Sequence, residues 1–403
     1  MPKMSNFFTY DELTWPEVAI LPRNTPLIIP LGDGYSLAKL AEGLGRPDQI
    51  GLLPPIPYGW RGSGLHVPEP LLGLLVANLL NSLRDDGFTQ VFALTPPQID
   101  LGLGASQISL FHETYRTPAP LLPLPSALQK VVLIPIGHTE QHGYHLPLAT
   151  DNLIIEAIGR GTAEATPDLA TCLPTFPYGV STHRASFAGT LNVGGRAFED
   201  FWLAVVDNLV ARGFDRFYLM SGHGGNCSFL TNVVKYAGER HRRIFCATAW
   251  LHTSGHIAAP VVQARRHSAR GGMGHAGELE TAMILHLRPD LTHMERVVDE
   301  TDFVSTTSYT MDWIEGGDLV ANPPWDDDTA TGAYGAGSVA TAENGRLWLE
   351  AGITEKVAHV QEIHEQQRRR EERRQQGYGL WGIESGDSVD RKRLTQRRKG
   401  AKN

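Results

Sequence analysis

Cysteines and long hydrophobic runs are scarce in this sequence of 403 residues. Its 3 cysteines, Cys172, Cys227 and Cys246, are widely spaced and form no CxxC pair. This usage is typical of a reducing compartment and argues against a disulfide framework and against a cysteine zinc site. The longest strongly apolar run, at 71–80, has about half of the roughly 20 residues that a membrane-spanning helix needs. We therefore expect a buried helix there and no membrane partner.

An excess of positive charge is also lacking, because the formal net charge at pH 7 is -8. Nucleic-acid binding generally needs a basic face, so a nucleic-acid partner is not expected. Residues 1–11 contain no basic region followed by an apolar one, as a secretory signal would. Together these absences predict a cytoplasmic protein.

The composition that remains, with 41% hydrophobic and 20% charged residues, is sufficient for at least one large core. Between 129 and 289, short runs rich in β-branched residues alternate with longer amphipathic segments. This alternation is typical of βα units around a mainly parallel sheet, and therefore of the α/β class. We expect strands at 130–135, 216–220 and 243–249, and helices at 151–165, 197–212, 226–241 and 277–287.

The N-terminal part repeats the same order of features with fewer polar residues. The paired segments are 27–32 with 133–137, 57–59 with 177–179, and 86–94 with 212–220. Where the second copy has acidic and histidine side chains, the first has Asp33-Gly34-Tyr35 and Thr95-Pro96-Pro97. We interpret the chain as a duplicated domain whose first copy lost its site. The alternative is that ordinary α/β patterning produced the match.

Domain boundaries follow from this interpretation and from composition. Repeated prolines predict a linker, because proline forbids a regular helix or a central strand; they are Pro118, Pro120, Pro123 and Pro125. We expect a degenerate domain without metal ligands at 1–113, the linker at 114–127 and a catalytic domain at 128–363. The Arg-rich remainder, 364–403, predicts a helix extension running into a basic, disordered tail. A solvated tail is expected, with contact to an acidic partner, to nucleic acid or to a neighbouring subunit as the alternative.

Candidate metal ligands are densest between 137 and 151, directly after a predicted strand and before a predicted helix. Glu140 and His142 lie in the loop, and Asp151 lies at the helix start. Ligands in α/β folds bind outside the carboxyl ends of strands, so these side chains can converge on one point. Taken alone, Asp151 is more typical of a helix N-cap and a loop histidine of a solvated surface. As a group they predict a metal site that suits Zn²⁺, Mn²⁺ or Fe²⁺.

A second candidate, His223, lies in the turn Ser221-Gly-His-Gly-Gly-Asn226, again between a predicted strand and a predicted helix. The small neighbours allow the imidazole to point inward. A glycine-rich turn of this kind can instead bind a phosphate at the helix N-terminus, but the GxGxxG spacing and the lysine of a P-loop are missing. We therefore favour a metal ligand.

The third segment, Gly274-His-Ala-Gly-Glu-Leu-Glu-Thr281, contains His275 and Glu278 on one face of a predicted helix start. Glu280 is expected to point elsewhere. Such a helix can supply a carboxylate ligand together with an imidazole that handles protons. The alternative is a charged first turn that only complements the helix dipole.

Together, the run 140–151, the turn 222–226 and the segment 275–281 resemble the creatininase (creatinine amidohydrolase) family. The resemblance covers roughly 129–289 and implies a three-layer creatininase-like fold, two divalent metal ions and a homo-oligomer. By resemblance, Glu140, Asp151 and His223 hold one metal. His142 and Asp151 hold the second, so that Asp151 bridges the two, and His275 matches a histidine that handles protons during the reaction.

The chain departs from the family pattern at two places. A glutamate that completes the second metal site in creatininase is replaced by Gly225. We expect Glu278 to take over its role, with Glu280 as the rival. Many relatives have Glu-His where His183 and Arg184 stand. These two positions are expected to contact the substrate, so the change argues against creatinine as the substrate.

The predicted reaction is hydrolysis of a carbon–nitrogen bond in a small metabolite, either an amide, a cyclic amide or a formamide. Two divalent cations lower the pKa of water and polarise a carbonyl, and His275 can pass a proton to the departing nitrogen. Two alternatives stay open. One is a peptidase that matures a small peptide. The other is a non-catalytic, metal-stabilised assembly protein that uses its N-terminal copy and basic tail as interaction surfaces.

Overall fold

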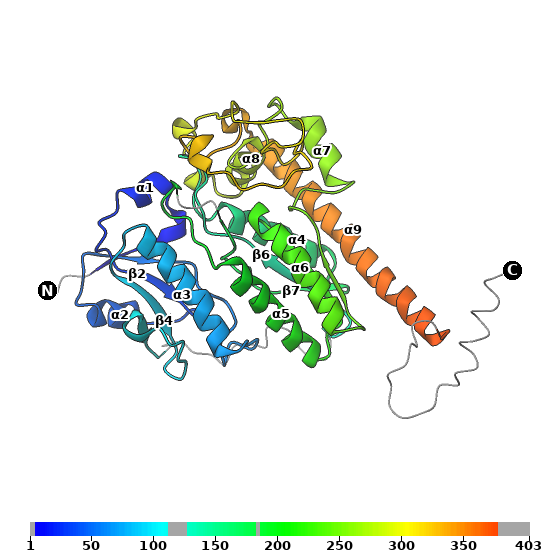
Figure 1. Cartoon of the computed structure of the whole chain (residues 1–403), viewed down its shortest axis with the longest axis horizontal. Helices are drawn as coiled ribbons and strands as arrows, with labels where there is room; N and C mark the ends of the chain where they lie inside the picture. The colour runs from blue at the N-terminus through cyan, green and yellow to red at the C-terminus, as the bar shows by residue number, and fades with distance from the viewer. Residues whose placement is uncertain (1–4, 112–126, 183–185, 378–403) are drawn as a thin grey trace.

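Two parallel sheets form the framework of the protein, one in each half of the chain (Figure 1). The computed structural model describes residues 5–111, 127–182 and 186–377. The first sheet has five strands in the order β1 (Asn6–Thr9), β3 (Gln49–Leu52), β2 (Leu27–Pro30), β4 (Val91–Thr95) and β5 (Gln107–Ser109). The second has four strands in the order β7 (Ala170–Cys172), β6 (Val131–Ile136), β8 (Arg216–Ser221) and β9 (Phe245–Thr248).

The central strands of the second sheet consist of apolar side chains that are buried on both faces. Every residue of β6, Val-Val-Leu-Ile-Pro-Ile, is buried, as expected for a parallel strand covered on both sides by helices. β6 pairs with β8 in a register that places Ile136 beside Ser221. The carboxyl ends of the two strands therefore lie side by side, and the loops that follow them meet.

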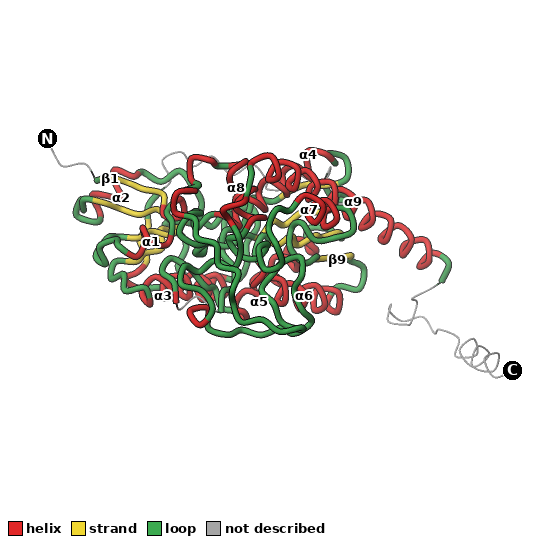
Figure 2. Tube along the Cα trace, turned by 90° about the horizontal axis from the view of Figure 1, so that it is seen from above, coloured by secondary structure: helices red, strands yellow, loops and turns green. Residues whose placement is uncertain are grey.

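Helices cover both faces of this sheet, which gives three layers (Figure 2). On one face, α5 (Gly195–Ala211) and α6 (Gly224–Arg240) pack on Val132, Ile134 and Phe217. On the other, α4 (Thr150–Ala165), α8 (Glu278–Leu287) and α9 (Ala342–Gln375) pack on the side chains of alternate strand residues, Val131, Leu133 and Tyr218. The expected α/β class and the expected three layers are confirmed.

The N-terminal half adds α1 (Trp15–Ala19), α2 (Leu37–Gly43) and α3 (Glu69–Asp85), and α7 (Ala258–Arg265) lies in the C-terminal half. α3 contains the apolar run 71–80, whose leucines are largely buried. No helix within the described ranges is both long and apolar enough to cross a membrane. The run is thus part of a core helix, as expected from its length.

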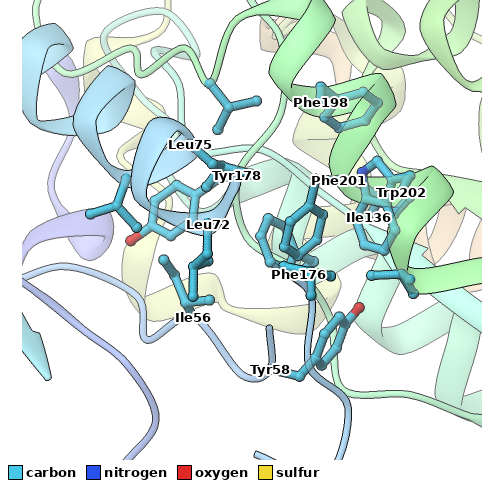
Figure 3. Packing of buried hydrophobic residues seen from close by; sticks show 14 of the residues in the cluster. Ile56, Tyr58, Leu72, Leu75, Ile136, Phe176, Tyr178, Phe198, Phe201 and Trp202 are labelled. Atoms are coloured by element: carbon cyan, nitrogen blue, oxygen red, sulfur yellow. The ribbon is translucent and has the colours of Figure 1, made fainter. Parts of the chain in front are cut away.

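One hydrophobic core cluster extends across both halves of the chain (Figure 3). Leu72 and Leu75 of α3 join Phe198, Phe201 and Trp202 of α5 in the same buried cluster. Removing one such aromatic side chain typically costs about 3–5 kcal/mol. Separating the halves would expose several of them at once, so the N-terminal half is an integral part of the folded protein.

The sets β3-β2-β4-β5 and β7-β6-β8-β9 follow the same topology. In each set, the second strand along the chain lies at one side, followed in space by the first, the third and the fourth. Duplication of one domain predicts this agreement. Related strand orders also occur in unrelated doubly wound sheets, so the strand order alone leaves duplication a prediction.

The C-terminal end of α9 projects away from the body of the molecule (Figure 1). Residues 364–375, which we expected at the start of the tail, continue this helix to Gln375. Arg368 and Arg369 pair with Glu365 one turn earlier, and each such exposed pair adds a few tenths of a kcal/mol to helix stability. The rest of the expected tail, 378–403, and most of the expected linker, 114–126, lie outside the described residues.

Candidate metal centre

A cluster of buried acidic and histidine side chains lies where the carboxyl ends of β6 and β8 meet. Each member is at most 4% exposed; the members are His138, Glu140, His142, Asp151, His223, His275 and Glu280. The loop after β6, the first turn of α4, the turn before α6 and the start of α8 all contribute to it. Four of the five predicted metal ligands and the predicted catalytic histidine are therefore brought together.

Asp151 presents a different carboxylate oxygen to each of two histidines. Its Oδ1 atom lies 3.3 Å from His142 Nε2, and its Oδ2 atom lies 3.2 Å from His223 Nδ1. A carboxylate that faces two imidazoles in this way is suited to bridge two cations. Glu140 lies beside the second histidine, with Oε1 3.0 Å from His223 Nδ1.

The structure corrects the placement expected for Glu278. Its carboxylate accepts hydrogen bonds from the backbone amides of His267 (2.9 Å) and Ser268 (2.7 Å), outside the cluster. Glu280 lies in the cluster instead, with Oε2 3.7 Å from His142 Nε2. Successive residues of a helix are rotated by about 100°, so two glutamates separated by one residue point in nearly opposite directions.

His275 is held in place by the loop that carries two of the acidic and histidine residues. Its Nε2 atom lies 2.7 Å from the backbone oxygen of Gln141, and its Nδ1 atom lies 3.5 Å from Glu140 Oε1. A carbonyl can only accept, so Nε2 carries the proton and Nδ1 faces Glu140. The next residue, Ala276, has φ of 53°, a left-handed conformation that is uncommon without glycine. Its amide donates to Glu280 Oε2 at 2.6 Å.

His138 is a member of the cluster that the sequence analysis missed. Its Nδ1 atom accepts a hydrogen bond from the amide of Gly179 (2.8 Å), so Nε2 carries the proton and faces Glu140 Oε2 at 3.9 Å. A signal was present in the sequence. His138, Glu140 and His142 alternate with other residues, and in an extended segment alternate side chains point to the same side.

The pKa values within the cluster reflect opposite charges held close together away from water. Burial alone would raise the pKa of Asp151, but the imidazoles of His142 and His223 lower it to about 2. Burial alone would lower the pKa of His142, but Asp151 and Glu280 raise it to about 9. Burial raises the pKa of Glu280 to about 7, an effect that His142 opposes.

The cluster fits the family's divalent cations. Its nitrogen and oxygen atoms form three groups, each with atoms within 4.8 Å of one another: His138–Glu140–His223, Glu140–His142–His275 and His142–Asp151–Glu280. His142 Nε2 and Asp151 Oδ2 make no hydrogen bond in the part of the chain that the structure describes. Buried polar atoms normally have a partner, and mixed imidazole and carboxylate groups are the ligands of Zn²⁺, Mn²⁺ and Fe²⁺.

At Gly225, where the resemblance to creatininase predicts a glutamate, there is no room for a side chain. A Cβ atom there would lie 2.3 Å from the backbone oxygen of Val180 and 2.4 Å from His223 Nε2. The turn is therefore packed around a glycine, and the third carboxylate enters the cluster from α8 instead.

The long segment 297–335 places an aromatic side chain against the cluster. Trp325 packs against His275 with ring centroids 4.8 Å apart, and Trp313 packs against Trp250 at 6.3 Å. Trp250, which is 47% exposed, lines a pocket of about 210 Å³ together with Cys227, Ser228, Thr231, Thr248 and Ala249. The predicted substrate-binding residues, His183 and Arg184, lie outside the described residues.

Comparison with known proteins gives the same family as the site. A creatininase (creatinine amidohydrolase) family model matches residues 125–360. A mycofactocin precursor peptide peptidase of Mycobacterium ulcerans is 34% identical over 173 residues, which are 41% of this chain and 62% of the relative. A creatinine amidohydrolase of Pseudomonas putida is 28% identical over 185 residues, 42% of this chain and 68% of the relative.

A crystal structure of creatinine amidohydrolase aligns with a TM-score of 0.50 and 25% identity over 58% of this chain and 91% of that one. The match to the mycofactocin peptidase spans less than two thirds of that relative. The family model, by contrast, spans more than half of this chain. The chain belongs to the creatininase family.

Proposed function

We propose that the protein is a metal-dependent hydrolase that cleaves a carbon–nitrogen bond in a small metabolite, either an amide, a cyclic amide or a formamide. The observation that carries this proposal is the carboxylate of Asp151, which faces His142 with one oxygen and His223 with the other. This geometry supports a pair of cations instead of a single one.

The proposed ligands divide into two sets that share Asp151. Glu140 and His223 complete the first set, and His142 and Glu280 complete the second. Zn²⁺, Mn²⁺ and Fe²⁺ all accept such ligands. When bound, a pair of divalent cations lowers the pKa of water towards neutrality and polarises the carbonyl to be attacked. His138 supports the first set, since its Nε2 proton faces Glu140.

The role proposed for His275 is proton transfer to the departing nitrogen. The Nε2 proton is engaged by the backbone of Gln141, so Nδ1 is the atom that receives and returns a proton on the side of Glu140. Gln141 holds the ring, and Trp325 packs against it and limits the access of water. We also keep His183 and Arg184 as proposed substrate contacts.

The test combines metal analysis with a screen for released amine. The purified full chain should contain close to two divalent ions, lose turnover of its amide or formamide substrate after chelation, and regain it with added metal. Glu140→Gln should abolish turnover while leaving the fold intact, whereas Glu164→Gln, on the exposed face of α4, should change neither. A chain that neither retains nor rebinds metal would overturn the proposal. Normal function in Glu140→Gln would favour the assembly protein.

Cleavage of a peptide bond is the second candidate function. It is favoured by the 34% identity to a precursor peptide peptidase and by the partly exposed Trp250 beside Trp313, which can contact a peptide side chain. Parallel assays with short peptides and with small amides separate the two candidates, because only one class should be turned over. A cytoplasmic location and a homo-oligomer remain parts of the proposal; the three free cysteines are consistent with the former.

A further inference from the structure

We propose that the N-terminal half is a built-in partner subunit. In this inference it is an inactive copy of the catalytic domain, attached through an internal pseudo-twofold interface, and its segment 10–19 positions the metal-binding loop. The positioning role rests on the proposed metal site, whereas the internal symmetry does not.

The two halves form the same backbone hydrogen bonds at matching points, around β2 and β3 in the N-terminal half and around β6 and β7 in the C-terminal half. After β2 and after β6, a glycine amide donates to the strand extension across from it: Gly32 to Ile56 at 2.9 Å, and Gly137 to Phe176 at 3.0 Å. Leucine amides after β3 and β7 donate to the backbone of β2 and β6, respectively: Leu53 to Ile28 at 2.9 Å, and Leu173 to Leu133 at 2.9 Å. The sequence repeat thus extends to the hydrogen-bond pattern.

The helices that follow also match in length and in the way they end. α3 and α5 have 17 residues each. Each ends in one further residue and then a glycine with φ in the left-handed region, 93° at Gly87 and 96° at Gly213. The phenylalanine after each glycine donates its amide back into the helix at 3.1 Å, Phe88 to Leu83 and Phe214 to Leu209. A general α/β pattern does not require this agreement.

The contact between α3 and α5 is reciprocal. Ser82 and Asn208 occupy the same position in their helices, five residues before the glycine that follows each helix. Each forms a hydrogen bond with the residue that lies three positions before the first residue of the other helix. Ser82 Oγ accepts from the amide of Asn192 at 3.1 Å, and Asn208 Nδ2 donates to the backbone oxygen of His66 at 3.1 Å. Reciprocal contacts between equivalent residues are the signature of a twofold interface.

A second pair of contacts repeats the relationship at the helix ends. Asp86 and Arg212, which each precede the terminal glycine, both bond to the segment leading into the opposite helix. Asp86 Oδ2 accepts from the amide of Gly189 at 2.8 Å, and Arg212 Nη1 donates to the backbone oxygen of Gly64 at 3.0 Å. The N-terminal half is therefore docked on the catalytic half as a second subunit would be.

From this position the N-terminal half reaches the metal-binding loop. The backbone oxygens of Asp11 and Leu13 accept hydrogen bonds from the amides of Ala149 and Leu148, each at 2.9 Å. Both amides lie between the proposed ligands His142 and Asp151. A segment of the N-terminal half thus fixes the last residues of the loop immediately before the bridging carboxylate.

Trp15 connects the same segment to the proton-transfer residue. Its Nε1 atom donates to the backbone oxygen of Thr331 at 2.8 Å, and its ring packs 5.4 Å from the rings of Tyr144 and Phe187. The next residue, Gly332, accepts from Gln141 Nε2 at 2.9 Å, and Gln141 in turn contacts His275. Trp15 therefore contacts both the metal-binding loop, through Tyr144, and the segment 297–335, through Thr331.

The experiment compares full-length variants for loop protection and for metal binding. In Trp15→Ala, amide hydrogen exchange of metal-free protein should increase about tenfold or more in the peptide containing Leu148 and Ala149. Its affinity for added Zn²⁺, measured by chelator competition, should fall by about 10- to 100-fold, as for other residues that orient metal ligands. Ile50→Ala, a buried change in a separate cluster of the N-terminal sheet, should alter neither measurement.

Trp15→Phe keeps an aromatic ring but loses the hydrogen bond to Thr331 and part of the indole packing, so it provides a milder test if Trp15→Ala does not fold. An intermediate increase in loop exchange supports the proposal, and wild-type exchange in both folded variants overturns it. If wild-type protein binds no Zn²⁺ but Trp15→Ala still accelerates loop exchange, the proposed function fails while the positioning contact stands.

Discussion

The carboxylate of Glu280 lies 3.7 Å from the imidazole Nε2 of His142, joining the start of α8 to the loop after β6. Glu280→Gln should remove one of the proposed ligands of the second cation while keeping the shape of the side chain. We expect metal content to fall from about two ions towards one per chain and turnover to fall at least 100-fold, on the scale of losing a ligand or its supporting partner. Metal analysis and steady-state kinetics provide the measurement.

Glu278→Gln is the matched control, because Glu278 is also fully buried but binds the amides of His267 and Ser268 instead. This variant should keep both ions and lose stability by about 1–3 kcal/mol, since charged acceptors of amides are replaced by weaker ones. If the two variants exchange these phenotypes, Glu278 and not Glu280 is the ligand.

Much of the C-terminal half could be predicted from sequence because its signals are local. The strand 216–220 and the helix 197–212 were expected from periodicity and flanking glycines, and they occur as β8 at Arg216–Ser221 and α5 at Gly195–Ala211. Glu140, His142 and Asp151 were expected together because they follow one predicted strand. His223 was a separate candidate, and the resemblance to the family joined it to them.

The choice between Glu278 and Glu280 could not be made in the same way. It depends on how α8 is rotated about its axis, which is decided by its packing on α9 and by the amides that bind Glu278. The packing of Trp325 on His275 was equally hidden, since the segment 297–335 has neither helical nor strand periodicity over most of its length. Contacts distant in sequence decide both features.

Gly225 provides a test of why the third carboxylate comes from α8. Gly225→Ala should destabilise the fold by about 1–3 kcal/mol and weaken metal binding, because the added Cβ would press on His223 and on the backbone oxygen of Val180. Denaturant unfolding and metal titration measure the two effects.

Gly238→Ala in the same helix is the control, because a Cβ there meets nothing within 4 Å. It should be neutral or stabilising by up to about 1 kcal/mol, as alanine is the better helix former. For the same steric reason, Gly225→Glu should not rescue Glu280→Gln. Recovery of the second ion in that double variant would show that the turn is able to open.

Lys356 should make stability depend on pH. The residue is 2% exposed, and its amine makes no hydrogen bond among the described residues. Burial lowers the pKa of the amine to about 8, with Glu355 opposing the shift. In the unfolded chain the amine has its ordinary pKa near 10.4 and is charged below that pH. The folded state is therefore less favourable than the unfolded chain for the charged amine. Below pH 8 this group destabilises the fold by about 3 kcal/mol, and the penalty fades as the pH rises from 8 towards 10.4.

Lys356→Met should accordingly stabilise the protein at pH 7, and its advantage should shrink at pH 9.5. Urea unfolding at the two pH values measures the difference. Lys235→Met, at an exposed position of α6, controls for the general loss of a positive charge and should show no such trend. An advantage that is equal at both pH values would mean that packing, not charge, is responsible.

The reciprocal contacts of Ser82 and Asn208 predict matching losses on the two sides of the internal interface. Ser82→Ala leaves the amide of Asn192 without its acceptor, and Asn208→Ala removes the donor to His66. Each should lower the free energy of unfolding by about 1 kcal/mol, the usual net value of a hydrogen bond. The losses should add within about 0.5 kcal/mol in the double variant if the two contacts act independently.

Asn81→Ala, next to Ser82 on the exposed face of α3, should cost almost nothing. Denaturant unfolding of the four variants measures these differences. If neither Ser82→Ala nor Asn208→Ala differs from Asn81→Ala, these two reciprocal hydrogen bonds contribute nothing to the association of the halves.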